Sequence, residues 1–225
     1  MLREHSANSW GSPQLASGGV ETEQGEIETI ETLVTQLFAM VSEALAGATE
    51  ALLGNDVAIG LAVVEGDQAV DDLTSEVELR VWPQLDVEGT PTSTLRHLVG
   101  VLLILPELER SGDLAEHIAQ RAVTNIGVEM SPLSRGIVQR MSEVALHMWR
   151  DAADAYVDRV SRAGALAEDD EEIDILHDRL TREIATGSMP SAIGAQVTLV
   201  ARFYERLGDH AVNLARRIEM LYGLA

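Results

Sequence analysis

The chain has 225 residues, and 37 acidic side chains against 16 basic ones, all arginine, give it a formal net charge of −21. So acidic a chain repels phosphate backbones and anionic lipid headgroups, which argues against nucleic-acid binding and against unaided attachment to membranes. It contains no cysteine, which excludes disulfides, thiolate metal sites and cysteine nucleophiles.

The composition favours helices. Hydrophobic residues make up 46% of the chain and aromatic residues only 4%, so a core would consist mainly of aliphatic side chains. The longest apolar run, Leu98 to Leu105, is far shorter than the roughly 20 residues that span a bilayer. No charged-then-apolar signal segment opens the chain, so we expect a cytoplasmic protein.

Residues 1–26 are rich in Ser, Gly and Gln without an apolar period, which predicts a flexible N-terminal tail. Helical periodicity follows almost throughout. The first helix is expected to end near Gly54, and a second helix to run from about Asp56 to Leu85. Residues 86–91 include Gly and Pro and predict a turn after the second helix.

Ser93 or Thr94 is expected to cap a third helix, which should end near Gly127 and be kinked at Pro106. This helix carries an apolar stripe at the 3.6-residue period. The turn before it contains a proline.

Three further helices complete the chain. An N-cap serine followed by proline at 131–132 predicts a fourth helix, which should end near Arg162. A fifth is expected over 168–185, a break over 186–190, and a sixth over 191–222. Six helices without a convincing strand predict an all-α protein.

Two parts of the chain repeat one another. Residues 109–119 match residues 205–215 at six of eleven positions with a constant offset of 96, and an upstream set of positions repeats at an offset of 103. A helix with one apolar stripe needs partners to bury it, so three helices joined by short loops should form an antiparallel bundle. We therefore predict two tandem three-helix bundles, 27–128 and 129–225, related by pseudo-twofold symmetry.

Acidic pairs four residues apart occur at matched positions in both halves. They are Asp67/Asp71 and Glu109/Asp113 in the first half, and Asp170/Asp174 and Glu205/Asp209 in the second. This spacing places both carboxylates on one helix face, about 5–6 Å apart at Cβ. If the two motif helices of a half pack antiparallel, four carboxylates converge, and a hard or borderline cation would turn their repulsion into binding. The alternative is an ordinary solvated acidic face.

Four neighbouring residues recur with these pairs. Gly112 and Gly208 lie mid-helix, where glycine costs up to about 1 kcal/mol relative to alanine, and indicate close approach of another backbone or of a ligand. Arg110 and Arg206 follow each motif glutamate. They could orient a carboxylate or bind an anion, or form ordinary surface ion pairs.

His117 lies one turn beyond Asp113, and Asn213 takes the corresponding place beyond Asp209. Both are candidate additional ligands or supporting residues, although a lone helical histidine is more often structural. We find no nucleophile elbow, phosphate-cradling glycine loop or His-Glu-x-x-His motif, and no Glu-x-x-His pair of the di-iron bundles. The acidic rows therefore indicate metal-supported structure or binding rather than catalysis.

The segment 201–215, Ala-Arg-Phe-Tyr-Glu-Arg-Leu-Gly-Asp-His-Ala-Val-Asn-Leu-Ala, resembles the hallmark of the PhoU family of phosphate-uptake regulators. The acidic-x-x-x-Asp pattern is the motif that repeats in those proteins. The resemblance covers residues 28–223 and both halves. It implies a six-helix protein of two bundles that binds metal ions, such as iron or zinc, at acidic surface clusters. The implied ligands are Asp67, Asp71, Glu109, Asp113, Asp170, Asp174, Glu205 and Asp209.

The resemblance also implies a regulatory function. Members of the family link a phosphate ABC transporter, through its ATPase, to a membrane sensor histidine kinase, and they repress the phosphate-starvation response when phosphate is plentiful. They are cytoplasmic, often homodimeric, and reach the membrane through protein partners. Two alternatives remain: a metal-dependent hydrolase that uses the same carboxylates, and a structural helical scaffold without metal.

Overall fold

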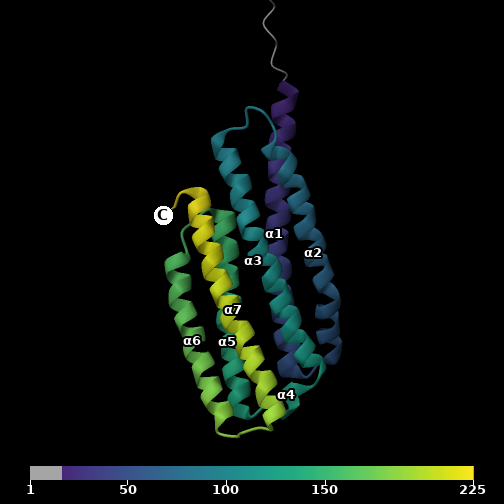
Figure 1. The fold of residues 1–225 in the computed structure, drawn as a ribbon, viewed down its shortest axis with the longest axis vertical. Coiled ribbons are helices and arrows are strands. Elements are labelled where there is room, and N and C mark those ends of the chain that lie inside the picture. The colour runs from purple at the N-terminus through teal and green to yellow at the C-terminus, as the bar shows by residue number, and fades with distance from the viewer. Residues whose placement is uncertain (1–16, 225) are drawn as a thin grey trace, which may run out of the picture.

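The computed structural model describes residues 17–224, with side chains from Gln24 onward, and this part of the chain forms seven α-helices and no β-strand (Figure 1). The helices are α1 (Ser17–Gly54), α2 (Val57–Leu85), α3 (Thr92–Val123), α4 (Ile126–Glu129), α5 (Pro132–Asp158), α6 (Ala163–Ala185) and α7 (Ser191–Tyr222). The all-α prediction is confirmed. The six expected helices are present, and α4 is an additional single turn.

The long helices form two three-helix bundles. α1, α2 and α3 pack on one another in the first bundle, and α5, α6 and α7 do so in the second. Successive long helices run in opposite directions, and the bundles join where α3 packs on α7 and α1 on α5 (Figure 1). Each of these joining pairs consists of equivalent helices, as the predicted pseudo-twofold arrangement requires.

The core is mainly aliphatic, as the composition predicts. On α1, the side chains of Ile30, Val34 and Leu37 are fully buried. By length and composition alone, Gln24–Gly54 is long and apolar enough to cross a membrane, although the sequence analysis expected no spanning segment. Packing accounts for this apolarity, because the buried side of α1 contributes to the core of the bundles.

Side chains cap the N-termini of α2 and α5, and the cap at Ser131 confirms the prediction for that position. The Asp56 carboxylate accepts hydrogen bonds from the backbone of Ala58 and Ile59 at 2.9 and 3.1 Å, and begins α2. The Ser131 hydroxyl accepts from the backbone N–H of Ser134 at 3.0 Å, and begins α5 with a proline in its first turn. In each case the cap and the N–H groups that it satisfies lie within three residues of each other.

The boundaries of α3 differ from those expected. Pro91 is the N-cap residue and makes no side-chain capping bond, so Ser93 and Thr94 lie inside the first turn and the cap prediction is wrong. The helix continues through Pro106, as expected, but ends at Val123 rather than near residue 127. It ends there because Asn125 takes a left-handed conformation with φ 60°, after which the chain forms α4.

The connection between α5 and α6 also differs. α5 ends at Asp158 rather than near residue 162, because Arg159 is left-handed with φ 55°. α6 begins at Ala163, five residues before the expected start. The Glu219 carboxylate of α7 accepts a hydrogen bond of 3.1 Å from the backbone N–H of Ala163 and another from Ser161, so a distant helix stabilises this N-terminus.

Part of the predicted flexible tail is helical. Residues 17–26 belong to α1, so the prediction of a tail through residue 26 is wrong for this stretch. Arg80 of α2 forms an ion pair of 2.9 Å with Glu26, which attaches the beginning of α1 to its neighbour. The tail prediction for residues 1–16 lies outside the described residues.

One polar network lies inside the apolar core. The hydroxyl groups of Tyr204 on α7 and Thr49 on α1 are 2.6 Å apart, and Ser142 on α5 donates to Thr49 at 2.9 Å. Tyr204 is fully buried, and burial raises the pKa of its hydroxyl to about 12, so it stays neutral. The network therefore links three helices from both bundles.

Replacing Tyr204 with phenylalanine is expected to lower the free energy of unfolding by about 1 kcal/mol, because Thr49 loses a buried hydrogen-bond partner. Urea denaturation measures this change. Tyr156→Phe is the matched control, since the buried Tyr156 hydroxyl has no hydrogen-bond partner among the described residues and its removal should cost nothing. Equal losses in both variants would show that the network does not contribute.

Candidate metal centre

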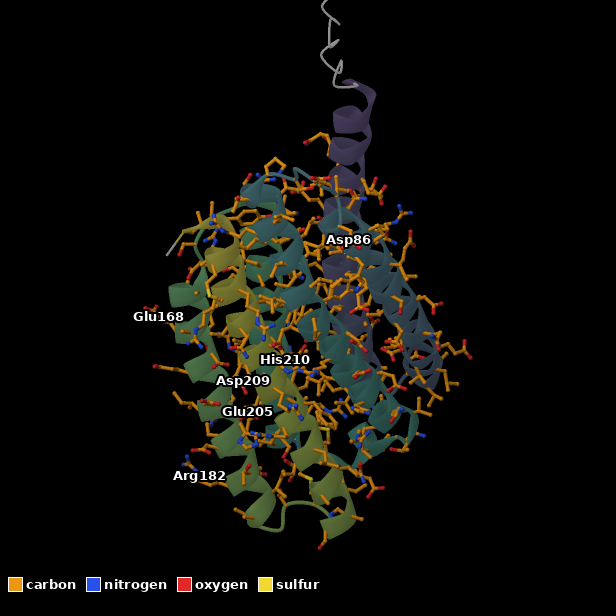
Figure 2. The ribbon with its side chains drawn as sticks, turned by 45° about the horizontal axis from the view of Figure 1, so that its top comes forward. Asp86, Glu168, Arg182, Glu205, Asp209 and His210 are labelled. Atoms are coloured by element: carbon orange, nitrogen blue, oxygen red, sulfur yellow. The ribbon has the colours of Figure 1, made fainter. Side chains whose placement is uncertain are left out.

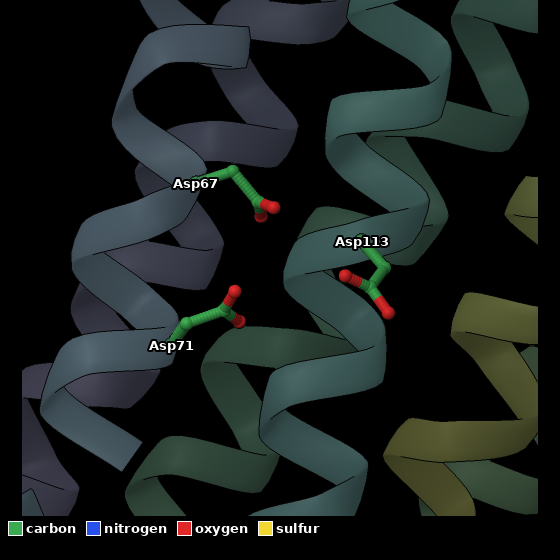
Figure 3. A group of neighbouring side chains, drawn as sticks. All are labelled: Asp67, Asp71 and Asp113. Carbon is green, nitrogen blue, oxygen red and sulfur yellow. The ribbon is translucent and has the colours of Figure 1, made fainter. Parts of the chain in front are cut away.

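Three aspartates on neighbouring helices meet in the first bundle. Asp67 and Asp71 project from successive turns of α2 toward α3, where Asp113 lies (Figure 3). One carboxylate oxygen from each lies within 4.8 Å of the other two, and all three side chains are half-buried. In the part of the chain that the structure describes, they are the one group of three acidic or histidine side chains that meets this distance.

Gly112 explains how α2 comes so close to α3. A Cβ atom at this position would lie 3.3 Å from Oδ1 of Asp67 and 3.2 Å from Cγ1 of Val70. In the second bundle, a Cβ atom at Gly208 would overlap the carboxylate of Asp170. A neighbouring helix does approach closely at both glycines, but the prediction that a backbone or a ligand fills the space is wrong. Side chains fill it: Asp67 and Val70 at Gly112, and Asp170 and Ile173 at Gly208.

The carboxylates of the first bundle are partly buried and repel one another. Burial is the main cause that raises the pKa of Asp67 to about 6. Further increases come, in decreasing order, from the negative charges of Glu116, Asp113, Asp71 and Glu109. We call Asp67, Asp71, Glu109, Asp113 and Glu116 the first cluster. Within the described residues no arginine or histidine forms an ion pair with any of its three aspartates.

Glu109 is exposed at the edge of this cluster. Burial, followed by the charges of Asp71 and Asp113, raises the pKa of its carboxyl. All four acids predicted for the first half therefore act on one another. The adjacent Asp72 is exposed and accepts a hydrogen bond of 3.0 Å from Gln68, which places it outside the cluster.

The second bundle repeats the arrangement between α6 and α7. Burial is again the main cause that raises the pKa of Asp170 to about 6, and the charges of Asp209, Asp174 and Glu205 raise it further. Figure 2 shows Glu205 and Asp209 on the stretch of α7 beside α6. We call these four residues the second cluster.

The two clusters differ in their surroundings. Glu116 belongs to the first cluster, whereas the matched position of the second half is Val212, which is buried. In the second half, the charge of Arg216 opposes the increase in the pKa of Asp170, and Arg202 forms an ion pair with Glu205. In the first half, the charge of Arg110 lowers the pKa of Glu109, but no arginine is paired with a carboxylate of that cluster in the part of the chain that the structure describes. The first cluster therefore has one more acidic residue and less compensation.

The additional candidates lie toward the contact between α3 and α7. His117 stacks on Phe203 of α7 with ring centroids 5.4 Å apart, and its Nε2 is 4.0 Å from a carboxylate oxygen of Glu116. Burial lowers the pKa of His210, and the positive charges of Arg206 and Arg110 lower it further. Asn213 is half-buried on α7. His117 is not part of the group of three aspartates, although it lies beside Glu116 of the first cluster.

Two features of this region were not predicted from the sequence. The first is Glu116, which lies three residues beyond Asp113, a spacing that indicates the same helix face. The second is a buried polar group in which His210 Nδ1 of α7 lies 2.9 Å from the Ser111 hydroxyl of α3. Arg217 forms an ion pair of 2.9 Å with the buried Glu107 in the same contact. No local pattern in the sequence indicates that these side chains meet.

Fold and site together define a class: a duplicated helical-bundle protein with one acidic cluster in each half. The PhoU domain model matches residues 34–122 and 138–218, and the chain belongs to the PhoU domain family. It is 36% identical over 169 residues to the phosphate-specific transport system accessory protein PhoU homolog of Caulobacter vibrioides, covering 72% of this chain and 73% of the relative. The homolog of Rhizobium meliloti is 33% identical over 171 residues, with coverage of 73% and 71%.

Solved structures agree with the fold. The crystal structure of PhoU from Pseudomonas aeruginosa has a TM-score of 0.82 at 24% identity and covers 88% of this chain and 97% of that one. PhoU from Streptococcus pneumoniae has a TM-score of 0.78 at 22% identity, with coverage of 88% and 96%. The resemblance to the PhoU family is thus confirmed, and the relatives support a phosphate-transport accessory protein.

In metal-stripped protein, the clusters should make the free energy of unfolding fall as the pH rises from about 4 to above 6. The folded-state pKa of Asp67 and Asp170 is about 6, against an ordinary value of 3.8, so the folded state holds more protons in this range. The protonated carboxyls of Asp67 and Asp170 therefore stabilise the folded state fully at pH values below their ordinary pKa of 3.8. This stabilisation is lost as the pH rises through about 6.

Urea denaturation in chelator at pH 5 and pH 7.5 measures this dependence. The double variant Asp67→Asn, Asp170→Asn should flatten it, and the exposed Asp72→Asn should leave it as in the wild type. A double variant with an unchanged pH dependence would contradict the assignment.

Proposed function

We propose that the chain is a non-catalytic, cytoplasmic regulator of phosphate uptake that binds metal ions at its two acidic clusters. The observation that carries the proposal is the convergence of Asp67, Asp71 and Asp113 within 4.8 Å in a bundle whose twin repeats the same acids. Membership of the PhoU family and the names of the curated relatives support the connection to phosphate transport.

The residues of the clusters fit a bound cation. Their donor atoms are carboxylate oxygens, which suit hard ions. Iron in the form of Fe³⁺, or manganese in the form of Mn²⁺, is therefore a better match than zinc. Because Gly112 has no side chain, the Asp67 carboxylate fits against α3 at this position, and a side chain on residue 112 would displace the carboxylate. A bound divalent or trivalent ion would supply the positive charge that the repelling carboxylates lack. Asp67, Asp71 and Asp113 would hold it in the first half, with Glu109 and Glu116 beside them, and Asp170, Asp174, Glu205 and Asp209 in the second.

Metal binding is expected to raise the melting temperature, and the first cluster should bind more tightly than the second because its charge is less compensated. Isothermal titration of chelator-treated protein with Mn²⁺ and with Zn²⁺ measures stoichiometry and affinity. The triple variant Asp67→Asn, Asp71→Asn, Asp113→Asn should lose the tighter site. The variant Asp170→Asn, Asp174→Asn, Asp209→Asn should lose the weaker one.

Asp72→Asn is the matched control, since this carboxylate is exposed on the same helix and bonded to Gln68. It should bind both ions as the wild type does. Absence of binding in wild-type protein, together with a melting temperature that ignores added ions, would overturn the metal proposal and leave the scaffold alternative.

In the proposed role, the protein is an adaptor between a phosphate ABC transporter ATPase and a sensor histidine kinase, and represses the phosphate-starvation response. It acts as a homodimer and reaches the membrane only through these partners. Ion binding would order the carboxylates of both clusters, which then form part of the recognition surface. The adaptor role is supported by membership of the PhoU family, since the relatives from Caulobacter vibrioides and Rhizobium meliloti are named accessory proteins of phosphate-specific transport.

Wild-type protein is expected to recover the transporter ATPase and the cytoplasmic part of the kinase in pull-down experiments, and chelator should reduce the recovery. The triple variant of the first cluster should behave like chelator-treated protein, and Asp72→Asn like the wild type. Failure to recover either partner would contradict the adaptor role, whereas recovery that ignores chelator would separate that role from metal. Hydrolysis of a phosphate ester by metal-loaded protein, lost in the triple variant, would instead favour the hydrolase alternative.

A further inference from the structure

An apolar groove runs between the first half of α3 and the last turns of α7, at the upper end of these helices in Figure 1. Its volume is about 360 Å³. The lining residues are Thr92, Leu95, Arg96, Val99, Gly100, Leu103, Arg217, Met220 and Leu221. Val99, Leu103 and Met220 are 47%, 49% and 62% exposed, so about half of each apolar side chain faces solvent.

Gly100 forms the floor of this groove. A Cβ atom at this position would overlap the side chain of Leu221, which packs directly on the glycine. Arg217 stands at one side, where it pairs with Glu107 and donates to the carbonyl of Leu103. These contacts fix the shape of the groove from within the fold.

The duplication supplies an internal comparison. The offset of 96 relates this groove to a second one at the other end of α3 and α7, lined by Gln120, Arg121, Thr124, Ile126, Ala192, Ile193 and Gln196. There, Thr124 stands in place of Met220 and Gln196 in place of Gly100. Both grooves join the same pair of helices, so packing of α3 on α7 does not require the apolar lining of the first.

The charge of the groove is opposite to that of the molecule. Its charged lining residues are Arg96 and Arg217, in a chain of net charge −21. Arg217 is paired with the buried Glu107, so Arg96 supplies the positive charge that an occupant would meet. Arg96 is exposed, and the equivalent position in the second groove is Ala192. An apolar occupant that carries carboxylates at its edges would match this surface in both polarity and charge.

We propose that this groove binds an amphipathic helix of a protein partner, with an apolar stripe flanked by Asp or Glu side chains. The α3 wall, residues 92–103, is about 18 Å long at 1.5 Å per residue, the length of a three-turn helix. An amphipathic helix in an apolar groove uses anchors at i, i+3, i+4 and i+7, which would lie along Leu95, Val99 and Met220.

A second copy of this chain fits less well. In a twofold dimer the same patch faces itself, so Arg96 of one copy would lie near Arg96 of the other, and no carboxylate lines the groove to compensate them. A membrane surface is also a poor match, because the apolar residues line a concave groove and the chain as a whole repels anionic lipid.

The groove is separate from the acidic clusters. Leu103 lies ten residues before Asp113 on α3, which is about 15 Å along the helix. The proposal therefore does not depend on metal binding, and either can fail without the other.

The experiment uses the full chain and two synthetic 14-residue amphipathic peptides with the same apolar stripe. One peptide carries Glu at the flanking positions and the other Lys. Titration followed by amide shifts in two-dimensional NMR should show binding of the Glu peptide, with the largest shifts at 92–103 and 217–221, and none of the Lys peptide. Higher salt should weaken the binding.

Met220→Glu should weaken binding of the Glu peptide about tenfold, the effect of losing one anchor and adding a like charge. Thr124→Glu, at the equivalent position of the second groove, is the matched control and should bind as the wild type does. Because both positions are exposed, both variants should fold, which circular dichroism checks.

Three outcomes would overturn the proposal. The first is no shift at peptide concentrations up to about 1 mM, an affinity too weak for a specific helix site. The second is equal binding of the two peptides, or shifts outside the groove. The third is evidence for another occupant of the groove. Such evidence would be a wild-type dimer, observed by sedimentation, that is absent in Met220→Glu. Binding of the wild-type protein, but not of this variant, to phosphatidylglycerol vesicles would count in the same way.

Discussion

The close approach of α2 to α3, and of α6 to α7, is the constraint on which both acidic clusters depend. At Gly112 and Gly208 the helix surface lacks a side chain, and an aspartate of the neighbouring helix fills the space. The carboxylates are thereby brought together and partly removed from water, although their charges repel. Such an arrangement costs free energy in two ways, through the mid-helix glycines and through the raised pKa values. A cation that offsets the repulsion is the simplest physical reason to keep it.

The contact between α3 and α7 holds the two halves together and is not symmetric in its chemistry. The buried Glu107 of α3 pairs with Arg217, whereas the matched residue of α7 is Phe203, which lies between His117 and Arg121. One side of the pseudo-twofold axis is thus ionic and the other aromatic. Breaking a buried ion pair leaves an uncompensated charge, so this contact also specifies how the halves meet.

The same backbone arrangement therefore carries different surfaces in its two halves. Both clusters contain their four matched acids, but only the first also contains Glu116. In the second cluster, the positive charge of Arg216 partly offsets the increase in the pKa of Asp170. The two grooves between α3 and α7 share their helices, but Met220 lines one and Thr124 the other. The two halves share their geometry, and differences in single side chains give each half its own surface properties.

The helices, the repeat, the cap at Ser131 and the eight matched acids could be predicted from the amino-acid sequence, because each of these signals lies within a few residues or recurs at a constant offset. The packing of the helices was needed to show that an aspartate fills the space beside each of the two glycines and that His117 stacks on Phe203. The same holds for the N-terminus of α6, which Glu219 stabilises from 56 residues away. A helical period shows which residues share a face, but not which distant helix that face meets, and these contacts depend on that choice.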